Sequence, residues 1–295
     1  MKNILISVMS LFLLMGCNKE GKKDTINPMA AVTSKANQYK ILLQQVQDTD
    51  GFIETSHCDS TLFSALTFEG VQLEAAEEGP GRWIRRPTTY PECYAAGESK
   101  STISRDMFIG IFWYAWRKQD LPMLNRIWDY GFSNFWKMGD GDASRVMFTP
   151  IMISTLAQMI YRLGGENHNI ARNIGTAWVS ELEGFQAHLQ VLLIGLRGVI
   201  YMDGISQRAV KMLKYNHDRE PNNHLFQAMY HKFSDGNQAE AINLLLGYPV
   251  SLPTSADWCS PWPTERDYNT DSTLSCNENR IHSGGELLFS YYLIK

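Results

Sequence analysis

Helical periodicity dominates the pattern of apolar and polar residues, and no stretch keeps the strict alternation of a half-buried strand. Three segments are apolar on nearly every side: 104–118, 149–163 and 184–200. Three others carry a single apolar stripe: 121–137, where the stripe runs on to Phe132 and Phe135, 204–215 and 237–247. A helix that is apolar all round must be covered on every side, whereas an amphipathic helix covers one side of its neighbour. The alternation therefore predicts an all-α domain with two concentric layers of helices.

Residues that favour helix ends support these boundaries. Asp120 and Asn237 are suitable N-caps, and Thr149 stands directly before a proline that can open a helix. Gly164 and Gly165 suit the end of the second apolar segment. Counting such segments gives about ten helices. Polar or charged residues interrupt the apolar segments, which argues against membrane-spanning helices: Arg105, Gln158, His188 and Arg197.

The first residues have the pattern of an exported protein. Lys2 supplies a positive charge, and the apolar run that follows is shorter than the roughly 20 residues that cross a bilayer. The run ends in Leu14-Met15-Gly16-Cys17, which resembles the lipobox of bacterial lipoproteins. This resemblance implies that residues 1–16 are a signal peptide and that an acylated Cys17 anchors the chain to a lipid bilayer. Residues 17–33 would be a flexible tether and residues 34–295 a single domain.

Export to an envelope also affects the other cysteines. Because residue 18 is Asn rather than Asp, resemblance to bacterial sorting rules favours the outer membrane over the inner one. Four cysteines remain after Cys17: Cys58, Cys93, Cys259 and Cys276. An even number in an oxidising compartment predicts disulfides, with three possible pairings, of which we favour Cys58–Cys93 and Cys259–Cys276. The alternative, a zinc site, lacks any CxxC spacing.

Polar residues gather where apolar helices are expected to start. Asp59 precedes one such helix, Ser104-Arg105-Asp106 another, and His282-Ser283-Gly284-Gly285-Glu286 the last. With the helical alternation, these starts resemble the (α/α) toroids of six-hairpin glycosidases and related polysaccharide lyases. The resemblance implies a ring of about five to six helical hairpins with a disulfide-stapled C-terminal loop. It concerns architecture rather than a diagnostic motif, and a plain helical bundle is the alternative fold.

Carboxylates at these helix starts are candidates for glycoside hydrolysis, which needs a pair of acidic side chains. The candidate catalytic residues are Asp59, Asp106, Glu286 and His282. Helix capping by Asp59 and a favourable helix-dipole position for Asp106 are the structural alternatives. The sequence does not assign the acid and the base.

Arginine and aromatic side chains near the same starts are candidates for holding a sugar. A guanidinium pairs with a carboxylate through two bonds, and an indole stacks on a pyranose face. The candidate substrate-binding residues are Arg82, Trp83, Arg85, Arg86, Arg105, Trp262 and His224. Trp262 belongs to the connection 249–283, whose length favours a lid or wall of a binding site. A solvated basic loop is the alternative for the arginines.

A second chemistry competes with hydrolysis. Asn222, Asn223, His224 and Tyr230 are similar to the Asn/His/Tyr set of toroid-type alginate and chondroitin lyases, in which His or Tyr moves protons in β-elimination. The sequence departs from that pattern because Tyr230 falls on the same expected helix as His224. Asn222-Asn223 is also a simple helix start, and His188 reads as a hydrogen-bonded core histidine. No motif for a nucleotide, a cofactor or a metal is present, and metal-assisted hydrolysis by His57, Asp59 and His282 lacks a ligand spacing.

Composition narrows the function classes. The chain has 295 residues, of which 44% are hydrophobic, and a formal net charge of -4. The apolar fraction excludes a disordered chain, and the mild acidity argues against a nucleic-acid partner. The leading interpretation is a lipid-anchored envelope protein that binds a polysaccharide and is a candidate glycoside hydrolase without a cofactor. A polysaccharide lyase and a non-catalytic glycan- or protein-binding surface lipoprotein are the alternatives.

Overall fold

A computed structural model describes residues 27–45, 47–53, 60–85, 103–173, 184–201, 205–247 and 285–295. The described part is mostly helical, which confirms the all-α prediction. Its helices are α1 (Pro28–Gln44), α2 (Ser60–Thr67), α3 (Met107–Lys118), α4 (Leu121–Ser133), α5 (Ala143–Val146), α6 (Pro150–Arg162), α7 (Asn169–Arg172), α8 (Gly184–Tyr201), α9 (Gln207–Arg219), α10 (His224–Phe233), α11 (Gln238–Gly247) and α12 (Gly285–Ile294).

A short β-hairpin was not predicted from the sequence. It follows the 3₁₀ turn Leu73–Ala76 and pairs β1 (Glu77–Gly79) with β2 (Arg82–Trp83) in antiparallel fashion. Strands this short carry too few residues to show an alternating pattern. Among the described residues, no helix is both long and apolar enough to cross a membrane.

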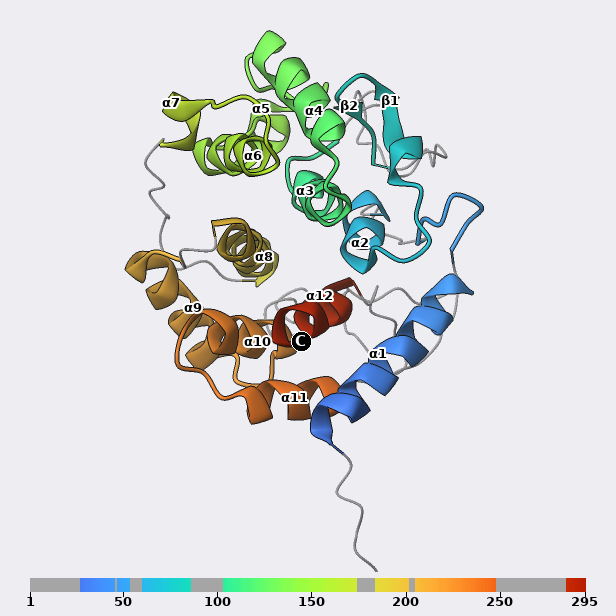
Figure 1. Ribbon diagram of the computed structural model, residues 1–295, viewed down its shortest axis with the longest axis vertical. Helices are drawn as coiled ribbons and strands as arrows, with labels where there is room; N and C mark the ends of the chain where they lie inside the picture. The colour runs from blue at the N-terminus through green and yellow to red at the C-terminus, as the bar shows by residue number, and fades with distance from the viewer. Residues whose placement is uncertain are drawn as a thin grey trace, which may run out of the picture.

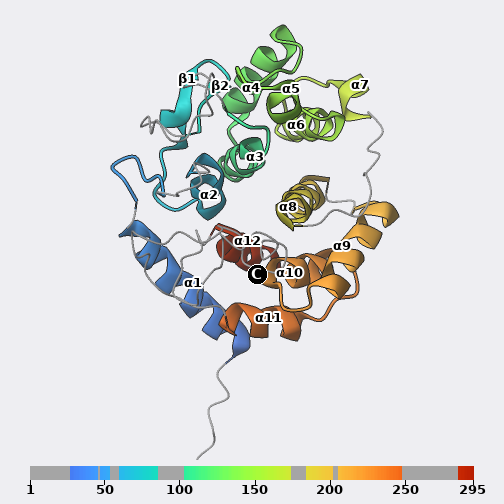
Figure 2. The same cartoon turned by 180° about the vertical axis from the view of Figure 1, so that it is seen from behind.

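Helices far apart in the sequence pack side by side in a closed cycle. In the described part of the chain, α2 contacts α3, α3 contacts α8, α8 contacts α10, α10 contacts α12, and α12 returns to α2. Figures 1 and 2 show these helices near the middle of the molecule, with α1, α4, α9 and α11 outside them. α6 packs between α4 and α8. We refer to α2, α3, α8, α10 and α12 as the inner helices.

The inner helices α2 and α3 run in the same direction. Near their starts, a methyl group built on Gly110 would lie 2.6 Å from the carbonyl oxygen of Leu62. Near their ends, the ring centroids of Phe68 and Tyr114 are 5.4 Å apart. Early residues therefore contact early residues and late residues contact late ones, which is the order expected of parallel helices.

Other pairs of inner helices show the same order. For α8 and α10, His188 contacts Phe226, and Gly198 lies against Phe233. For α3 and α12, Trp113 contacts Phe289, and Arg117 contacts Tyr292. For α10 and α12, His224 contacts Ser290. In addition, Nε2 of Gln238, the first residue of α11, which follows α10, donates to the carbonyl of Ile294 at the end of α12. The starts of all inner helices consequently lie at one end of the cycle, which we call the N-terminal face.

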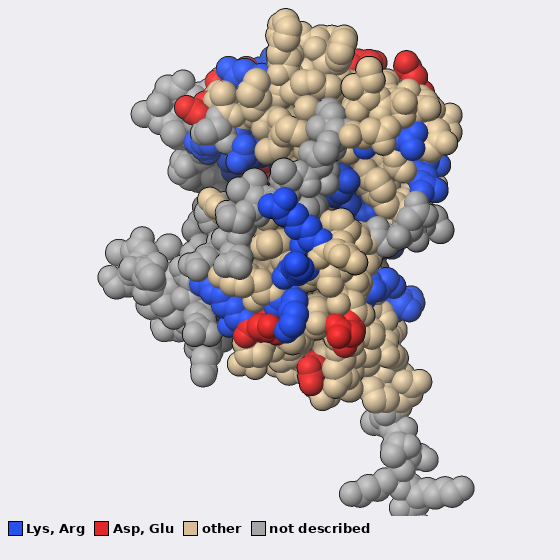
Figure 3. Space-filling view, turned by 90° about the vertical axis from the view of Figure 1, so that its left-hand side faces the viewer, with Lys and Arg blue, Asp and Glu red and all other residues tan. Residues whose placement is uncertain are grey.

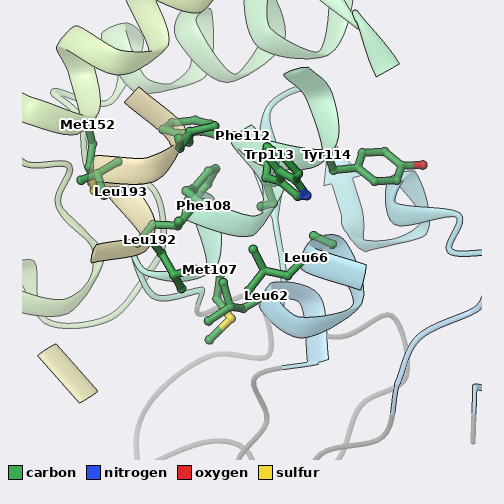
Figure 4. Close-up of a cluster of buried hydrophobic side chains, with 14 of the residues drawn as sticks. Leu62, Leu66, Met107, Phe108, Phe112, Trp113, Tyr114, Met152, Leu192 and Leu193 are labelled. Carbon is green, nitrogen blue, oxygen red and sulfur yellow. The ribbon is translucent and has the colours of Figure 1, made fainter. Parts of the chain in front are cut away.

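Apolar side chains fill the space between the inner helices. Figure 4 shows side chains from α2, α3, α6 and α8 meeting in one cluster, with Leu62, Met107, Phe108 and Leu192 among those labelled. Every residue of α3 from Met107 to Ala115 is buried, whereas α4 and α9 each bury four residues. The prediction that 104–118 is covered on nearly every side, whereas 121–137 and 204–215 bury a single stripe, is thus confirmed for α3, α4 and α9. Burial of this apolar surface is the main favourable contribution to folding.

Two details of the predicted boundaries were wrong. Residues 28–33, assigned to the tether, form the start of α1, where Val32 is only 2% exposed. The apolar stripe of 121–137 was taken to include Phe132 and Phe135, but these side chains are 69% and 83% exposed. α4 ends at Ser133, and Phe135 and Trp136 then adopt positive φ angles that turn the chain away from the helix axis.

Gly110 is required where α3 crosses α2. Gly110→Ala would place a methyl group 2.6 Å from the Leu62 carbonyl oxygen and 3.0 Å from the Ala65 side chain. Although alanine favours helix, we expect this overpacking to lower the free energy of unfolding by about 1–3 kcal/mol. Urea denaturation followed by circular dichroism measures the loss. Gly79→Ala is the matched control, because nothing lies within 4 Å of the added methyl group. Equal stability of the two variants would contradict the close packing.

An ion pair and a hydrogen bond connect three helices at the opposite end of the cycle. Glu69 follows α2, and its Oε1 lies 2.6 Å from Nζ of Lys40 on α1. The hydroxyl of Tyr292 on α12 donates to the same oxygen over 2.9 Å. Burial would raise the pKa of Glu69, but the hydrogen bonds from Lys40 and Tyr292 outweigh burial and hold this pKa below its usual value.

This network predicts an acid-sensitive contribution to stability. A carboxyl group with a lowered pKa stabilises the fold above the unfolded pKa of about 4.3, and the contribution is lost as the pH falls through the folded value. Because the pair is partly exposed, Glu69→Gln should lower the free energy of unfolding by about 0.5–1 kcal/mol near neutral pH. The difference from wild type should vanish in acid. Urea denaturation at several pH values measures it, with Glu78→Gln, whose carboxylate lies 3.6 Å from Arg82, as the control. A deficit that persisted in acid would contradict the electrostatic explanation.

Candidate functional site

The start of α3 places a carboxylate at the N-terminal face. Asp106 occupies the N-cap position with helical backbone angles, and its side chain makes no capping bond. Within the described part of the chain, this half-buried carboxylate takes part in no hydrogen bond or ion pair. Neighbouring Arg105 is held through its backbone, whose N–H donates to the carbonyl of Arg145 over 2.8 Å. Asp106 is therefore available to a ligand.

A buried arginine connects the starts of α2 and α3. Nη2 of Arg85 donates to Oγ of Ser104 over 2.9 Å. The backbone carbonyl of Arg85 accepts from the N–H of Thr61 in the first turn of α2 over 3.1 Å. Both side chains of the Arg85–Ser104 pair are 7% exposed. Arg85 thus holds the segment before α3 in place.

The start of α10 carries a buried polar group. Oδ1 of Asn223 caps the helix by accepting from the backbone N–H of Leu225 and Phe226 at 3.1 and 3.3 Å. Nδ2 of Asn223 donates to Oε2 of Glu220 over 3.1 Å and lies 3.4 Å from Nε2 of His188 on α8. Because Oδ1 accepts two backbone bonds, the orientation of the amide is determined and Nδ2 can only donate. Nδ2 of Asn223 therefore faces both the carboxylate of Glu220 and the ring nitrogen of His188.

A second buried pair extends this group to α12. Nδ1 of His224 lies 3.1 Å from Oγ of Ser290. Glu220 is 5% exposed, His224 3% and His188 1%. Ionisable groups are rarely buried to this degree unless they are hydrogen-bonded. Three inner helices, α8, α10 and α12, thus contribute polar side chains to one cluster.

The predicted substrate-binding residues differ in how deeply they are buried and in which residues they contact. Trp83 is completely buried, so its indole has no exposed face, and the predicted stacking on a sugar is wrong for this conformation. The side chain of Arg82 lies 3.1 Å from Asp140 and 3.6 Å from Glu78, and it is partly exposed. His224 belongs to the buried cluster. Sequence reasoning could not foresee the burial of Trp83, because burial depends on how the elements pack together and not on the local pattern.

Several predicted residues lie outside the described part of the chain. They are Asp59, Arg86, Trp262, His282 and all the cysteines: Cys17, Cys58, Cys93, Cys259 and Cys276. Glu286 is the second residue of α12, at the N-terminal face, but its side chain is not among those described. His57, the other member of the metal alternative, is also outside. The described residues hold no group of three or more His, Cys, Asp or Glu side chains that could bind a metal ion.

The residues of the lyase-like set do not meet in the structure. The hydroxyl of Tyr230 donates to Oδ1 of Asp235 over 2.6 Å, and its ring packs on that of His217. The hydrogen bond to Asp235, with burial second, raises the pKa of Tyr230. His224 lies at the first position of the same helix, bonded to Ser290.

Sequence reasoning missed two members of the cluster. Glu220 and Ser290 gave no signal, because a single acidic residue before a proline and a serine in an apolar helix are common. His188 was interpreted as a hydrogen-bonded core histidine, which agrees with its burial and its contact with Asn223. Its location beside the start of α10 was not predictable, since His188 and Asn223 are 35 residues apart.

Comparison with known proteins adds no assignment: no family model, no curated protein and no solved structure matches this chain. Function must therefore be inferred from the arrangement of its own residues.

The buried amide predicts a large difference between two similar substitutions. Asn223→Asp keeps the capping oxygen but removes the N–H donor and places a second carboxylate beside Glu220. We expect it to lower the free energy of unfolding by about 3 kcal/mol near neutral pH, because it brings two carboxylates together in a buried site. The loss should shrink as the solution becomes acidic, since protonation of either carboxyl removes the repulsion.

The matched control is Asn237→Asp. Asn237 is exposed, caps α11 through a 2.9 Å bond to the N–H of Ala239, and also lies beside a glutamate, Glu240. We expect this variant to stay within about 0.5 kcal/mol of wild type. Guanidinium denaturation of both variants at neutral and acidic pH measures the contrast. Equal losses in the two variants would show that burial of the Asn223 cluster is energetically unimportant.

Proposed function

We propose that this protein is a lipid-anchored cell-envelope protein that binds a polysaccharide at the N-terminal face and cleaves it as a glycoside hydrolase. The observation that carries the proposal is the Asp106 carboxylate, which stands at this face without an internal partner in the described residues. A carboxylate at a helix start normally caps the helix or forms an ion pair. One that does neither is free to act on a ligand.

The fold that we propose is an (α/α) toroid. The closed cycle of parallel inner helices, with amphipathic helices outside, supports this assignment. In such an arrangement the loops that enter the inner helices surround one face. Residues from segments that are distant in the sequence can therefore act on the same substrate.

Hydrolysis of a glycosidic bond needs one carboxyl group to protonate the leaving oxygen and a second to activate water or attack the sugar. Asp106 supplies one of them in this proposal. Asp59, which precedes the first residue of α2, and Glu286, the second residue of α12, are the candidates for the other. Arg105 lies next to Asp106 and is placed to bind a hydroxyl or acidic group of the sugar, while His282 is a candidate for proton transfer.

The anchoring part of the proposal depends on the N-terminal sequence. Residues 1–16 would be removed as a signal peptide, and an acylated Cys17 would hold the protein at a bilayer, with the outer membrane favoured. α1 begins at Pro28, so a short segment would connect the lipid to the folded domain. The proposed disulfides, Cys58–Cys93 and Cys259–Cys276, belong to the same exported state.

Among the alternatives, β-elimination receives less support from the geometry. A lyase needs the amide, the histidine and the tyrosine at one site, whereas Tyr230 bonds to Asp235 and His224 to Ser290. A non-catalytic glycan-binding or protein-binding lipoprotein would use the same face without needing Asp106.

A paired substitution tests the proposal. The purified protein is incubated with a panel of bacterial envelope and plant polysaccharides, and new reducing ends and the ultraviolet absorbance of unsaturated uronates are measured. We expect reducing ends without the unsaturated chromophore. Asp106→Asn should lower the rate by about 10²–10⁴-fold, the range typical of a lost general acid or base. Its stability should change by less than about 1 kcal/mol, because the carboxylate has only the helix dipole as a partner.

Asp129→Asn is the control, since Asp129 is an exposed aspartate of α4. It should retain full activity. Chromophore formation would favour the lyase, and no product from any substrate would favour the non-catalytic alternative. Full activity of Asp106→Asn would remove Asp106 from the catalytic residues.

A further inference from the structure

Three arginines gather along the line where α6 packs between α7 and α8. We call this place the arginine seam and define it by Arg162 of α6, Arg172 of α7 and Arg197 of α8, with Tyr161 and Tyr201 beside them. Within the described residues, neither Arg172 nor Arg197 forms an ion pair with an acidic side chain. The proposed function uses none of these residues.

Arg197 is partly buried and has no carboxylate partner among the described residues. Its Nη1 donates to Oγ1 of Thr155 over 2.8 Å and to the carbonyl of Ile151 over 3.3 Å. Its Cζ lies 4.5 Å from the ring centroid of Tyr201. Burial lowers the pKa of Arg197, against an opposing effect of Tyr201. Neutral hydrogen bonds compensate a desolvated guanidinium only in part, so an anion at this place would be stabilised.

Arg172 of α7 and Arg162 of α6 are the other two arginines of the seam. Cζ of Arg172 lies 3.6 Å from the ring centroid of Tyr161. Its Nε donates to Gln158 over 2.7 Å and its Nη1 to Asn167 over 2.6 Å, which uses two of the five N–H donors of a guanidinium. Nη2 of Arg162 donates to the carbonyl of Tyr201 over 2.9 Å.

Ser154 of α6 contacts both Arg172 and Tyr201. Oγ of Ser154 donates to the backbone carbonyl of Arg172 over 3.0 Å and lies 3.3 Å from the hydroxyl of Tyr201. The backbone of Arg172 and the tyrosine beside Arg197 are therefore within reach of one small side chain. The three cations belong to one local environment.

The surrounding surface is also basic. Figure 3 faces the side of the molecule formed by α7 and α9 and shows Lys and Arg side chains in a band down its middle, with Asp and Glu side chains at the lower end. α9 contributes the exposed residues Arg208, Lys211 and Lys214, of which Lys214 pairs with Asp218 over 2.6 Å. Such a band raises the local concentration of anions.

We propose that the arginine seam binds an acidic group, a carboxylate, phosphate or sulfate, of the polysaccharide and so selects an anionic glycan. The inference rests on the proposed function for the class of polymer, and it adds a second contact site. His188, at the N-terminal face, and Arg197 lie nine residues apart on α8, about 14 Å along the helix axis. A polymer, unlike a single sugar, can span that distance.

The composition of the seam favours a sugar over a membrane surface. Guanidinium groups pair with oxyanions through two parallel bonds, and here they are accompanied by ring faces, a hydroxyl and amides. Tyr161, which is 42% exposed, offers part of its ring to a pyranose. A flat anionic bilayer would not reach Arg197 between the helices.

Direct binding tests the proposal. Titration calorimetry of the purified protein with polygalacturonate, an anionic polymer, and dextran, a neutral one, measures recognition of charge. We expect binding to polygalacturonate, weakened by salt and by competing inorganic phosphate, and none to dextran. Arg197→Met and Arg172→Gln should each weaken binding by about tenfold or more, as expected when one partner of a charged hydrogen bond is lost. Equal binding of both polymers, no binding of either, or unchanged affinity in both variants would overturn the proposal.

Two controls separate binding from folding. Arg197→Met removes a desolvated charge without leaving a carboxylate unpaired, so the unfolding midpoint should not fall enough to explain a loss of binding. Lys118→Gln removes one positive charge from an exposed ion pair with Glu74 on another side of the cycle and should bind as wild type. If phosphatidylglycerol vesicles capture the protein while polygalacturonate does not, the anion belongs to a lipid and the proposal fails.

A last comparison separates this inference from the proposed hydrolysis. Asp106→Asn should bind polygalacturonate as wild type even where it no longer releases reducing ends. Binding that depends on the arginines, in a protein that cleaves no polymer, would leave the seam standing and reject the hydrolase. Cleavage that is unaffected by Arg197→Met and Arg172→Gln would support the hydrolase and reject the seam.

Discussion

The parallel packing of the inner helices is the constraint on which the other features depend. α2 and α3 approach so closely that Gly110 lies against the backbone of Leu62, and the cycle closes through α8, α10 and α12. Parallel helices present their unsatisfied N–H groups and the positive ends of their dipoles on one side. The N-terminal face is therefore suited to carboxylates and anionic ligands before any particular side chain is considered.

Polar chemistry is confined to places where the helix packing allows it. Between the inner helices the space is filled with hydrocarbon, as Figure 4 shows for Phe108 and its neighbours, and a polar group there would have to be compensated. At the start of α10, Asn223 meets this requirement by capping its own helix and bonding to Glu220. Asp106 differs from Asn223, because its carboxylate neither caps its helix nor bonds to another side chain among the described residues. That contrast separates a structural polar group from one that is available for function.

Charged side chains gather at two places in the molecule. The N-terminal face combines Asp106, Glu220 and the arginines near the start of α3, and the arginine seam lies farther along α8 toward its C-terminal end. A single small ligand would not need both. A long charged polymer would use one for chemistry or recognition at a sugar and the other for the acidic groups farther along the chain.

Local sequence determined several of the helices and some of their ends, because a cap or an amphipathic stripe depends on residues within one or two turns. Asp120 and Asn237 cap α4 and α11 as their neighbours implied, and the alternation of buried and half-buried helices followed from side-chain polarity alone. Only the tertiary structure decided which residues meet. His188 reaches Asn223 across 35 residues and His224 reaches Ser290 across 66, Trp83 is covered completely, and Phe135 is left in solvent. These outcomes depend on how whole helices pack against one another. The pattern within a single segment does not show which other segments will become its neighbours.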